Sequence, residues 1–357
     1  MKSSLAADIS DRHQFDMVID VRTPDEFAED HIPGAVNYPV LSNEERILVG
    51  TMYKQESPFE AKKIGAALIA KRIAHYIEND FIDKPKNWNP LIYCWRGGKR
   101  SGSMTHILRQ IGWNAQILDG GYKSYRRQVV SQLNNLPKKF NYVVITGQTG
   151  SAKSRILEQL SVLGAQVLDL EAIAVHKGSV LGNIPNSPQP SQKKFETQLV
   201  EALETFSTSK VVFVEAESRK IGTLHVPDLL LEQMRSSPCI KINATMDARV
   251  DYLIHDYAYF INEPSNLVST LDFLKELHSK EKLEHWKTLA RESQWPLLVQ
   301  ELLEQHYDAL YRRSQNSNYV NYEKATSYNT ADLSAKDRKS TRLNSSHVAL
   351  SRMPSSA

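Results

Sequence analysis

The sequence predicts two α/β domains in series, each built on a parallel sheet, with a helical region at the end of the second. Three observations lead to this prediction. The chain has 357 residues, more than one hydrophobic core usually serves. Short apolar runs alternate with helical patterns over 17–121 and again over 142–215, which is typical of parallel sheets. From residue 228 to about 313 the pattern is mainly helical.

The elements of the first domain follow from its apolar runs and the residues that flank them. The predicted strands are 17–21 (MVIDV), 35–40 (AVNYPV), 90–94 (PLIYC) and 115–121 (AQILDGG). The predicted helices begin at Pro24 and cover 62–77 and 101–111. Parallel sheets bind ligands beyond the carboxyl ends of their strands, so the end of strand 90–94 is a predicted functional edge.

A helix over 129–136 and the segment PKKFN lead into the second domain. We therefore predict domains at 1–135 and 136–336. The predicted strands of the second domain are 142–146, 165–170, 211–215 and 241–246, and its first helices are 155–163 and 194–206.

The last residues of the chain, 337–357, differ from the rest. DRKSTRLNSSH resembles the translation of a common sequencing-adapter oligonucleotide, and the following residues have no apolar periodicity. We interpret 337–357 as a non-native tail and leave it out of the fold prediction. This tail holds four cationic residues and one aspartate, a net charge of +3, so the rest of the chain has a net charge of zero. The mild basicity therefore indicates nothing about nucleic acid.

The composition is that of an ordinary soluble protein, with 41% apolar and 24% charged residues. Two cysteines, Cys94 and Cys239, cannot build a disulfide framework, which favours a reducing compartment. No apolar stretch is long enough to cross a membrane, and the first residues lack a signal-peptide core. We expect a cytoplasmic protein with no membrane partner. The sequence predicts no oligomeric state.

Cys94 opens the loop CWRGGKR, which follows an apolar strand and precedes a helix. Backbone amides at a glycine turn, a helix N-terminus and nearby cations would all stabilise a thiolate. The sequence therefore predicts Cys94 as a catalytic thiol in an anion-binding loop; an ordinary buried thiol beside a cationic turn is the alternative. The other loop residues are Trp95, Arg96, Gly97, Gly98, Lys99 and Arg100.

The segment VIDVRTPDEFAEDHIPGAVNYPV (18–40) resembles the entry of a rhodanese-like sulfurtransferase domain, and DGGY (119–122) resembles its end. This resemblance implies that Cys94 carries sulfur or selenium as a persulfide-type adduct. Simple rhodaneses place the arginine one position nearer the cysteine than Arg100 lies here. The longer spacing suits a tetrahedral oxyanion, so a phosphatase remains a physical alternative.

The segment GQTGSAKS follows strand 142–146 and precedes a helix, the context of a P-loop. Its amides can bind phosphate, Lys153 can neutralise charge, and the Ser154 hydroxyl could bind Mg²⁺. Ala152 stands where the pattern has glycine and should resist a positive φ. The predicted diphosphate-binding residues are Gly147, Gln148, Thr149, Gly150, Ser151, Ala152, Lys153 and Ser154.

The usual acidic partner of a P-loop is an aspartate at a strand end, whereas VVFVEAES offers Glu215 and Glu217. A solvated strand end is the alternative interpretation. We predict diphosphate binding rather than NTP hydrolysis. No residues are assigned to a resident metal.

Longer strings resemble the tRNA 2-selenouridine synthase family: ERILVGTMYKQ, YCWRGG, DLEAIAVHKGSVLG, QPSQKKFE and EAESRKIG. The resemblance spans most of 15–325. It implies that selenium from selenophosphate replaces the sulfur of 2-thiouridine in a tRNA anticodon loop, through an S-geranylated intermediate made from geranyl diphosphate. These two donors are co-substrates, and no tightly bound cofactor is expected. A generic sulfurtransferase with a nucleotide-binding domain is the alternative, and a phosphatase or P-loop kinase comes third.

The resemblance also suggests which residues surround the donor or the tRNA. Trp95 is predicted to stack on RNA, whereas Tyr122 and Tyr125 are more often packing residues. For His176 a polar surface position is an equal alternative, and Arg219 and Lys220 could form only a solvated turn. The predicted substrate-pocket residues are Asp169, Glu171, His176, Lys177, Ser179, Glu215, Glu217, Arg219 and Lys220.

Overall fold

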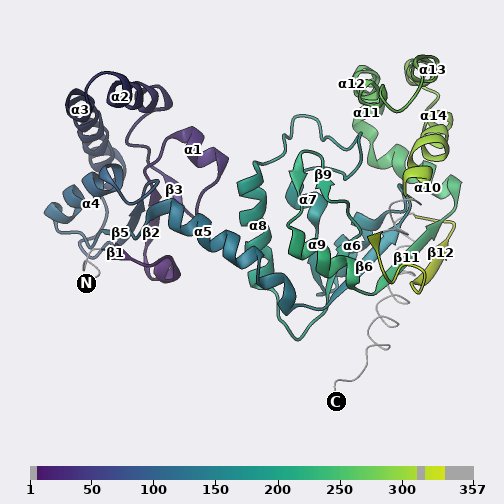
Figure 1. Ribbon diagram of the computed structural model, residues 1–357, viewed down its shortest axis with the longest axis horizontal. Helices are drawn as coiled ribbons and strands as arrows, with labels where there is room; N and C mark the ends of the chain where they lie inside the picture. The colour runs from purple at the N-terminus through teal and green to yellow at the C-terminus, as the bar shows by residue number, and fades with distance from the viewer. Residues whose placement is uncertain (1–5, 312–317, 334–357) are drawn as a thin grey trace. The chain divides into compact units, whose positions relative to one another are not determined.

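The computed structural model describes residues 6–311 and 318–333 (Figure 1). The tail predicted to be non-native, 337–357, lies outside the described residues. The chain divides into two compact units, Met1–Gln132 and Leu133–Ala357, so the division falls three residues before the predicted boundary. Each unit is described by itself.

The first unit contains a parallel five-stranded sheet in the order β1-β5-β4-β2-β3. Its strands are β1 Ala6–Ala7, β2 Met17–Asp20, β3 Val36–Asn37, β4 Pro90–Tyr93 and β5 Gln116–Leu118. Its helices are α1 Pro24–Glu29, α2 Asn43–Gln55, α3 Pro58–Tyr76, α4 Lys99–Ile111 and α5 Gly121–Leu133. The predicted parallel α/β fold is therefore confirmed.

Three details of the first unit differ from the prediction. The helix expected to start at 129 begins at Gly121, because the DGG segment forms a turn rather than the end of strand β5. Helix α2 was not predicted, although Ser42 and Glu45 form a capping box at its start. Strand β1 has two residues, too few to produce a recognisable apolar pattern in the sequence.

The second unit also has a parallel five-stranded sheet, in the order β12-β11-β6-β8-β7. Its strands are β6 Tyr142–Gly147, β7 Gln166–Leu168, β8 Val212–Glu215, β11 Cys239–Ala244 and β12 Thr326–Thr330. Four helices accompany them: α6 Lys153–Val162, α7 Leu170–Ala174, α8 Gln192–Thr205 and α9 Asp228–Ser236. Strand β12 (TSYNT) was not predicted because its residues are mostly polar.

The helical region of the second unit has an apolar core of its own, which includes Leu271, Leu274, Trp286 and Leu298. Its helices are α10 Met246–Asp256, α11 Ala258–Asn262, α12 Pro264–Thr270, α13 Lys280–Arg291 and α14 Trp295–Leu302, with a π-helical turn at Leu303–Tyr307. The predicted helical region is confirmed. In the described part of the chain, no helix is long and apolar enough to span a membrane.

Candidate functional site

Cys94 directly follows strand β4, at the carboxyl end of the sheet of the first unit. Its sulfur accepts hydrogen bonds from the Gly98 backbone N–H and from the Ser101 hydroxyl, each at 3.2 Å. Gly98 is the residue before helix α4, so the positive end of the helix dipole lies beside the sulfur. The side chain is buried and also packs in the core of the unit.

The pKa of the Cys94 thiol is held below its ordinary value. Burial by itself would raise this pKa, but hydrogen bonds from the Ser101 hydroxyl and from the amides of Ser101, Arg96 and Gly98 outweigh it. For Cys239, by contrast, burial raises the pKa to about 11. Cys94 therefore has the larger thiolate fraction at neutral pH.

Arg100, which the sequence predicted as part of the anion-binding loop, pairs with Glu26. Its guanidinium donates hydrogen bonds of 2.6 and 3.2 Å to the two carboxylate oxygens. Burial would raise the pKa of Glu26, but Arg100 holds it below its usual value, so Glu26 is a carboxylate at neutral pH. An anion bound at the loop would have to compete with Glu26 for this guanidinium.

The start of helix α5 packs against the thiol loop. The amide of Tyr122 donates to the Cys94 carbonyl at 2.9 Å, and the amide of Lys123 donates to the Trp95 carbonyl at 3.0 Å. A Cβ at Gly121 would lie 2.4 Å from the Cys94 carbonyl oxygen, so only glycine fits there. The half-buried Trp95 lies 5.3 Å from the buried Tyr122, measured between ring centroids.

The P-loop of the second unit connects strand β6 to helix α6. Ala152 adopts a left-handed conformation, with φ 57° and ψ 31°, which costs a non-glycine residue about 1–2 kcal/mol. The predicted resistance to positive φ thus does not prevent the turn. A Cβ at Gly150 would lie 2.9 Å from Leu253, so the loop packs closely on helix α10.

Three glutamates gather beside the P-loop. The Ser154 hydroxyl lies 2.9 Å from a Glu171 oxygen and 3.3 Å from a Glu215 oxygen. One oxygen each of Glu171, Glu215 and Glu217 lies within 4.8 Å of the others. Such oxygen donors suit a hard divalent cation, so these residues could hold Mg²⁺. Glu215 and Glu217 are both buried, so the alternative of a solvated strand end is wrong.

The pKa values of these three carboxyl groups are raised. Burial is the main cause for each of them, and repulsion from neighbouring carboxylates adds to it. The pKa of Glu217 reaches about 8. Lys153 lowers all three values but does not offset burial. A cluster of this kind favours binding a cation or sharing protons.

A pocket of about 630 Å³ brings most of the predicted residues together. Glu215 does not line the pocket, but it accepts a hydrogen bond from Ser154, which does. His176 is buried, so the surface alternative for this residue is wrong. The predicted residues that line the pocket are Thr149, Gly150, Ala152, Lys153, Ser154, Asp169, Glu171, His176, Lys177, Ser179 and Glu217.

Arg219 and Lys220 do not line this pocket. Both are exposed, and Arg219 forms an ion pair of 2.9 Å with Asp228. Lys220 begins strand β9 (Lys220–Ile221), which pairs in a hairpin with β10 (Leu224–His225). The alternative of a solvated cationic turn describes them better.

Sequence reasoning missed the residues that hold the P-loop from the helical side. The buried Arg249 donates to the Thr149 carbonyl at 2.8 Å and pairs with Asp308 at 2.6 and 3.0 Å. The Gly147 amide donates to the Tyr311 hydroxyl at 2.6 Å. Nothing in the local sequence marks these residues, because Arg249 and Asp308 lie 59 residues apart in the chain.

Comparisons with known proteins agree with this arrangement. Residues 2–128 match the family described as rhodanese-like domain, and residues 140–280 match the tRNA 2-selenouridine synthase AAA domain. A tRNA 2-selenouridine synthase of Alcanivorax borkumensis is 34% identical over 267 residues, which cover 73% of this chain and 72% of that protein. The chain belongs to the tRNA 2-selenouridine synthase family.

Other members of this synthase family support the assignment. A relative from Sulfurovum is 31% identical over 85% of this chain and 83% of its own length. One from Nitrosomonas europaea is 39% identical over 67% of this chain. The match to the Nitrosomonas protein spans 63% of that protein, which is less than two thirds of it. The thiol loop lies within the rhodanese-like match and the P-loop within the AAA match.

Proposed function

We propose that this chain replaces the sulfur of 2-thiouridine, at the wobble position of tRNA, with selenium from selenophosphate. The observation that carries this proposal is the presence on one chain of an activated thiol and a P-loop pocket, in a protein whose relatives are named tRNA 2-selenouridine synthase. An S-geranylated tRNA is the proposed intermediate.

The first step uses the P-loop. The sulfur of 2-thiouridine forms a bond to C1 of geranyl diphosphate, the C1–O bond breaks, and diphosphate leaves with the electron pair, while N3 of the base loses its proton to water. The loop amides and Lys153 stabilise the charge that develops on the leaving group. Mg²⁺ bound by Ser154 and the glutamates would neutralise further charge. Alkylation makes the sulfur a better leaving group than sulfide.

The second step uses the thiol loop. The selenium of selenophosphate, already at the selenide level, forms a bond to C2 of the alkylated base, the C2–S bond breaks, and the geranyl thiolate leaves with the electron pair. Water then takes the phosphoryl group as the P–Se bond breaks, and phosphate is released. We assign Cys94 to the delivery of selenium, because its loop combines a stabilised thiolate with amides that can bind an anion such as selenophosphate.

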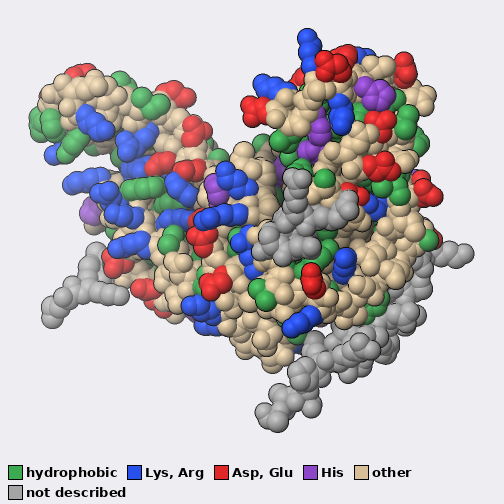
Figure 2. All heavy atoms as spheres, turned by 45° about the vertical axis from the view of Figure 1, so that its right-hand side comes forward, with side chains coloured by type: hydrophobic (Ala, Val, Ile, Leu, Met, Phe, Trp, Pro, Cys, Tyr) green, Lys and Arg blue, Asp and Glu red, His purple; other side chains and the backbone are tan. Residues whose placement is uncertain are grey.

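The proposed tRNA partner requires cations near the thiol. Arg96, Lys99, Lys123 and Arg127 are exposed on the loop and on helices α4 and α5, which border it. Figure 2 shows Lys and Arg side chains gathered on the visible face of the first unit. Such side chains supply phosphate contacts, and the half-buried Trp95 could stack on a base.

The test incubates the full chain with thiolated tRNA, geranyl diphosphate and selenophosphate, and measures nucleosides by mass spectrometry. Lys153→Ala should abolish geranylation, whereas Cys94→Ser should abolish selenation and leave geranylation intact. Cys239→Ser, which changes the other buried thiol, serves as the control and should retain both. If the wild type formed neither product but transferred sulfur from thiosulfate to cyanide without tRNA, the generic sulfurtransferase would be the better interpretation.

A further inference from the structure

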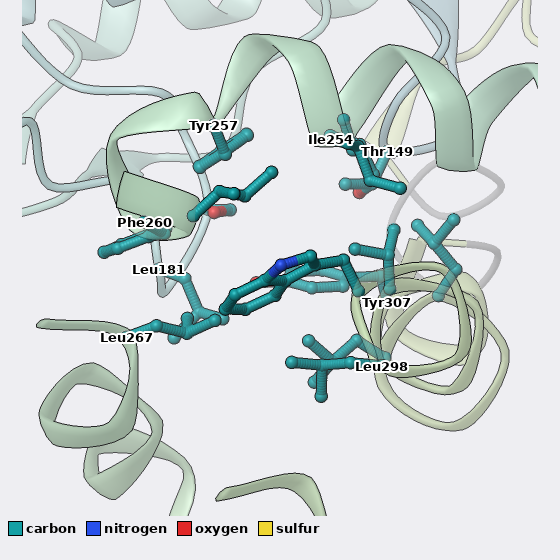
Figure 3. A pocket seen from close by; sticks show the side chains of 15 residues that line it. Thr149, Leu181, Ile254, Tyr257, Phe260, Leu267, Leu298 and Tyr307 are labelled. Atoms are coloured by element: carbon teal, nitrogen blue, oxygen red, sulfur yellow. The ribbon is translucent and has the colours of Figure 1, made fainter. Parts of the chain in front are cut away.

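A second cavity lies inside the helical region, beside the P-loop pocket (Figure 3). Its volume is about 80 Å³ and its lining is almost entirely apolar. Helices α10, α11, α12 and α14 and the π-helical turn supply most of its walls. The lining residues include Leu181, Ile254, Phe260, Leu267, Trp295 and Val299.

This cavity adjoins the P-loop pocket. Five residues line both spaces: Thr149, Ser179, Leu253, Tyr257 and Tyr307. In Figure 3, Thr149 lies on one side of the cavity and Leu267 and Phe260 lie on the other. The phosphate-binding loop therefore forms one wall of an apolar chamber.

The polar groups of the chamber lie at the shared end. Thr149, Ser179, Tyr257 and Tyr307 carry hydroxyl groups there, whereas the residues that line only the apolar cavity are hydrophobic. The Lys177 ammonium lies 4.3 Å from the centroid of the Tyr257 ring and pairs with Asp256 at 2.5 Å, so the shared end is also the charged end of the chamber. This gradient suits a ligand with an anionic head and a hydrocarbon tail.

The chamber is an open site rather than a packing defect. Ile254, Tyr257, Trp295 and Val299 are only partly buried, although they would gain from full burial. The two spaces together fall within the roughly 300–1,000 Å³ of small-molecule sites, and the apolar part is much the smaller. Because the apolar part is small, a short hydrocarbon chain fits it better than a long one.

We propose that the apolar cavity binds the hydrocarbon chain of a short-chain prenyl diphosphate, whose diphosphate lies in the P-loop. The helical region thereby selects the donor by the length of its chain. This inference rests on the proposed function, because it requires that the P-loop hold the diphosphate of the alkyl donor. The Arg249 contact to Thr149 links the two parts, since it fixes the loop residue at their junction.

The test fills the cavity and measures binding to the full chain by calorimetry. Val299→Trp should weaken geranyl diphosphate binding by about tenfold, the effect of excluding roughly two methylene groups, and leave inorganic diphosphate binding unchanged. The five-carbon dimethylallyl diphosphate should be affected less. Leu297→Trp is the matched control, because Leu297 lies on the same helix but is 47% exposed and does not line the cavity; it should bind all three ligands as the wild type does.

The outcomes distinguish a failure of the cavity assignment from a failure of the proposed function. If Val299→Trp bound geranyl diphosphate as tightly as Leu297→Trp while the wild type geranylated tRNA, the cavity assignment would be wrong and the proposed function would stand. If the wild type bound geranyl diphosphate no better than inorganic diphosphate, the cavity assignment would also be wrong. If the wild type bound neither ligand and made no geranylated tRNA, both proposals would fail.

Discussion

The Ser101 hydroxyl is the group on which the reactivity of Cys94 should depend most. It donates to the Cys94 sulfur at 3.2 Å inside the first unit, where Ser101 is fully buried. A hydrogen bond to a charged acceptor contributes about 1.5–3 kcal/mol. Ser101→Ala should destabilise the thiolate by that amount, and a tenfold change in ionisation corresponds to about 1.4 kcal/mol.

The measurement is the pH dependence of alkylation by iodoacetamide, followed in a Cys239→Ala background so that one thiol reacts. Ser101→Ala should shift the midpoint toward higher pH by at least about one pH unit. The rate at neutral pH should fall less than the thiolate fraction, because a more basic thiolate is also a better nucleophile. The midpoint is therefore the decisive quantity.

Ser103→Ala is the control, since Ser103 lies on the same helix two residues further along and should leave the midpoint unchanged. A Ser101→Ala midpoint equal to that of the control would refute the reasoning and leave the backbone amides as the cause. The folded pKa lies below the unfolded one, so the free energy of unfolding should rise with pH between the two values. Ser101→Ala should reduce that rise.

Three further predictions concern other parts of the two loops. Ala152→Gly should change the free energy of unfolding by less than about 1 kcal/mol, because relief of left-handed strain is offset by a lost buried methyl and a more flexible unfolded chain; a larger change in urea denaturation would contradict this. Asp308→Ala should destabilise the protein by about 3–5 kcal/mol, since it removes the counter-charge of the buried Arg249, and wild-type stability in the same titration would contradict it. Glu26→Gln should weaken the pair with Arg100, so that phosphate protects Cys94 from alkylation at lower concentration than in the wild type; equal protection would show that Arg100 does not contact the anion.

Local sequence patterns were sufficient to predict much of the fold and both loops. Strand β4 and helix α4 follow from an apolar run and a helical pattern on either side of Cys94, and the P-loop follows from a fixed spacing between strand and helix. These features depend on residues close together in the chain, so their periodicity and spacing can be read directly. Helix α2 could also have been predicted from its capping box.

The sequence by itself determined most strands and helices of the two α/β units, the thiol loop and the phosphate loop, because each of these elements is built by neighbours in the chain. Only the tertiary structure decided which distant groups meet them. Arg100 pairs with Glu26 across 74 residues, and Arg249 pairs with Asp308 across 59. The glutamate cluster and the apolar cavity arise in the same way, from side chains on separate elements. Such contacts depend on how the layers pack, and packing leaves no signal in the local order of residues.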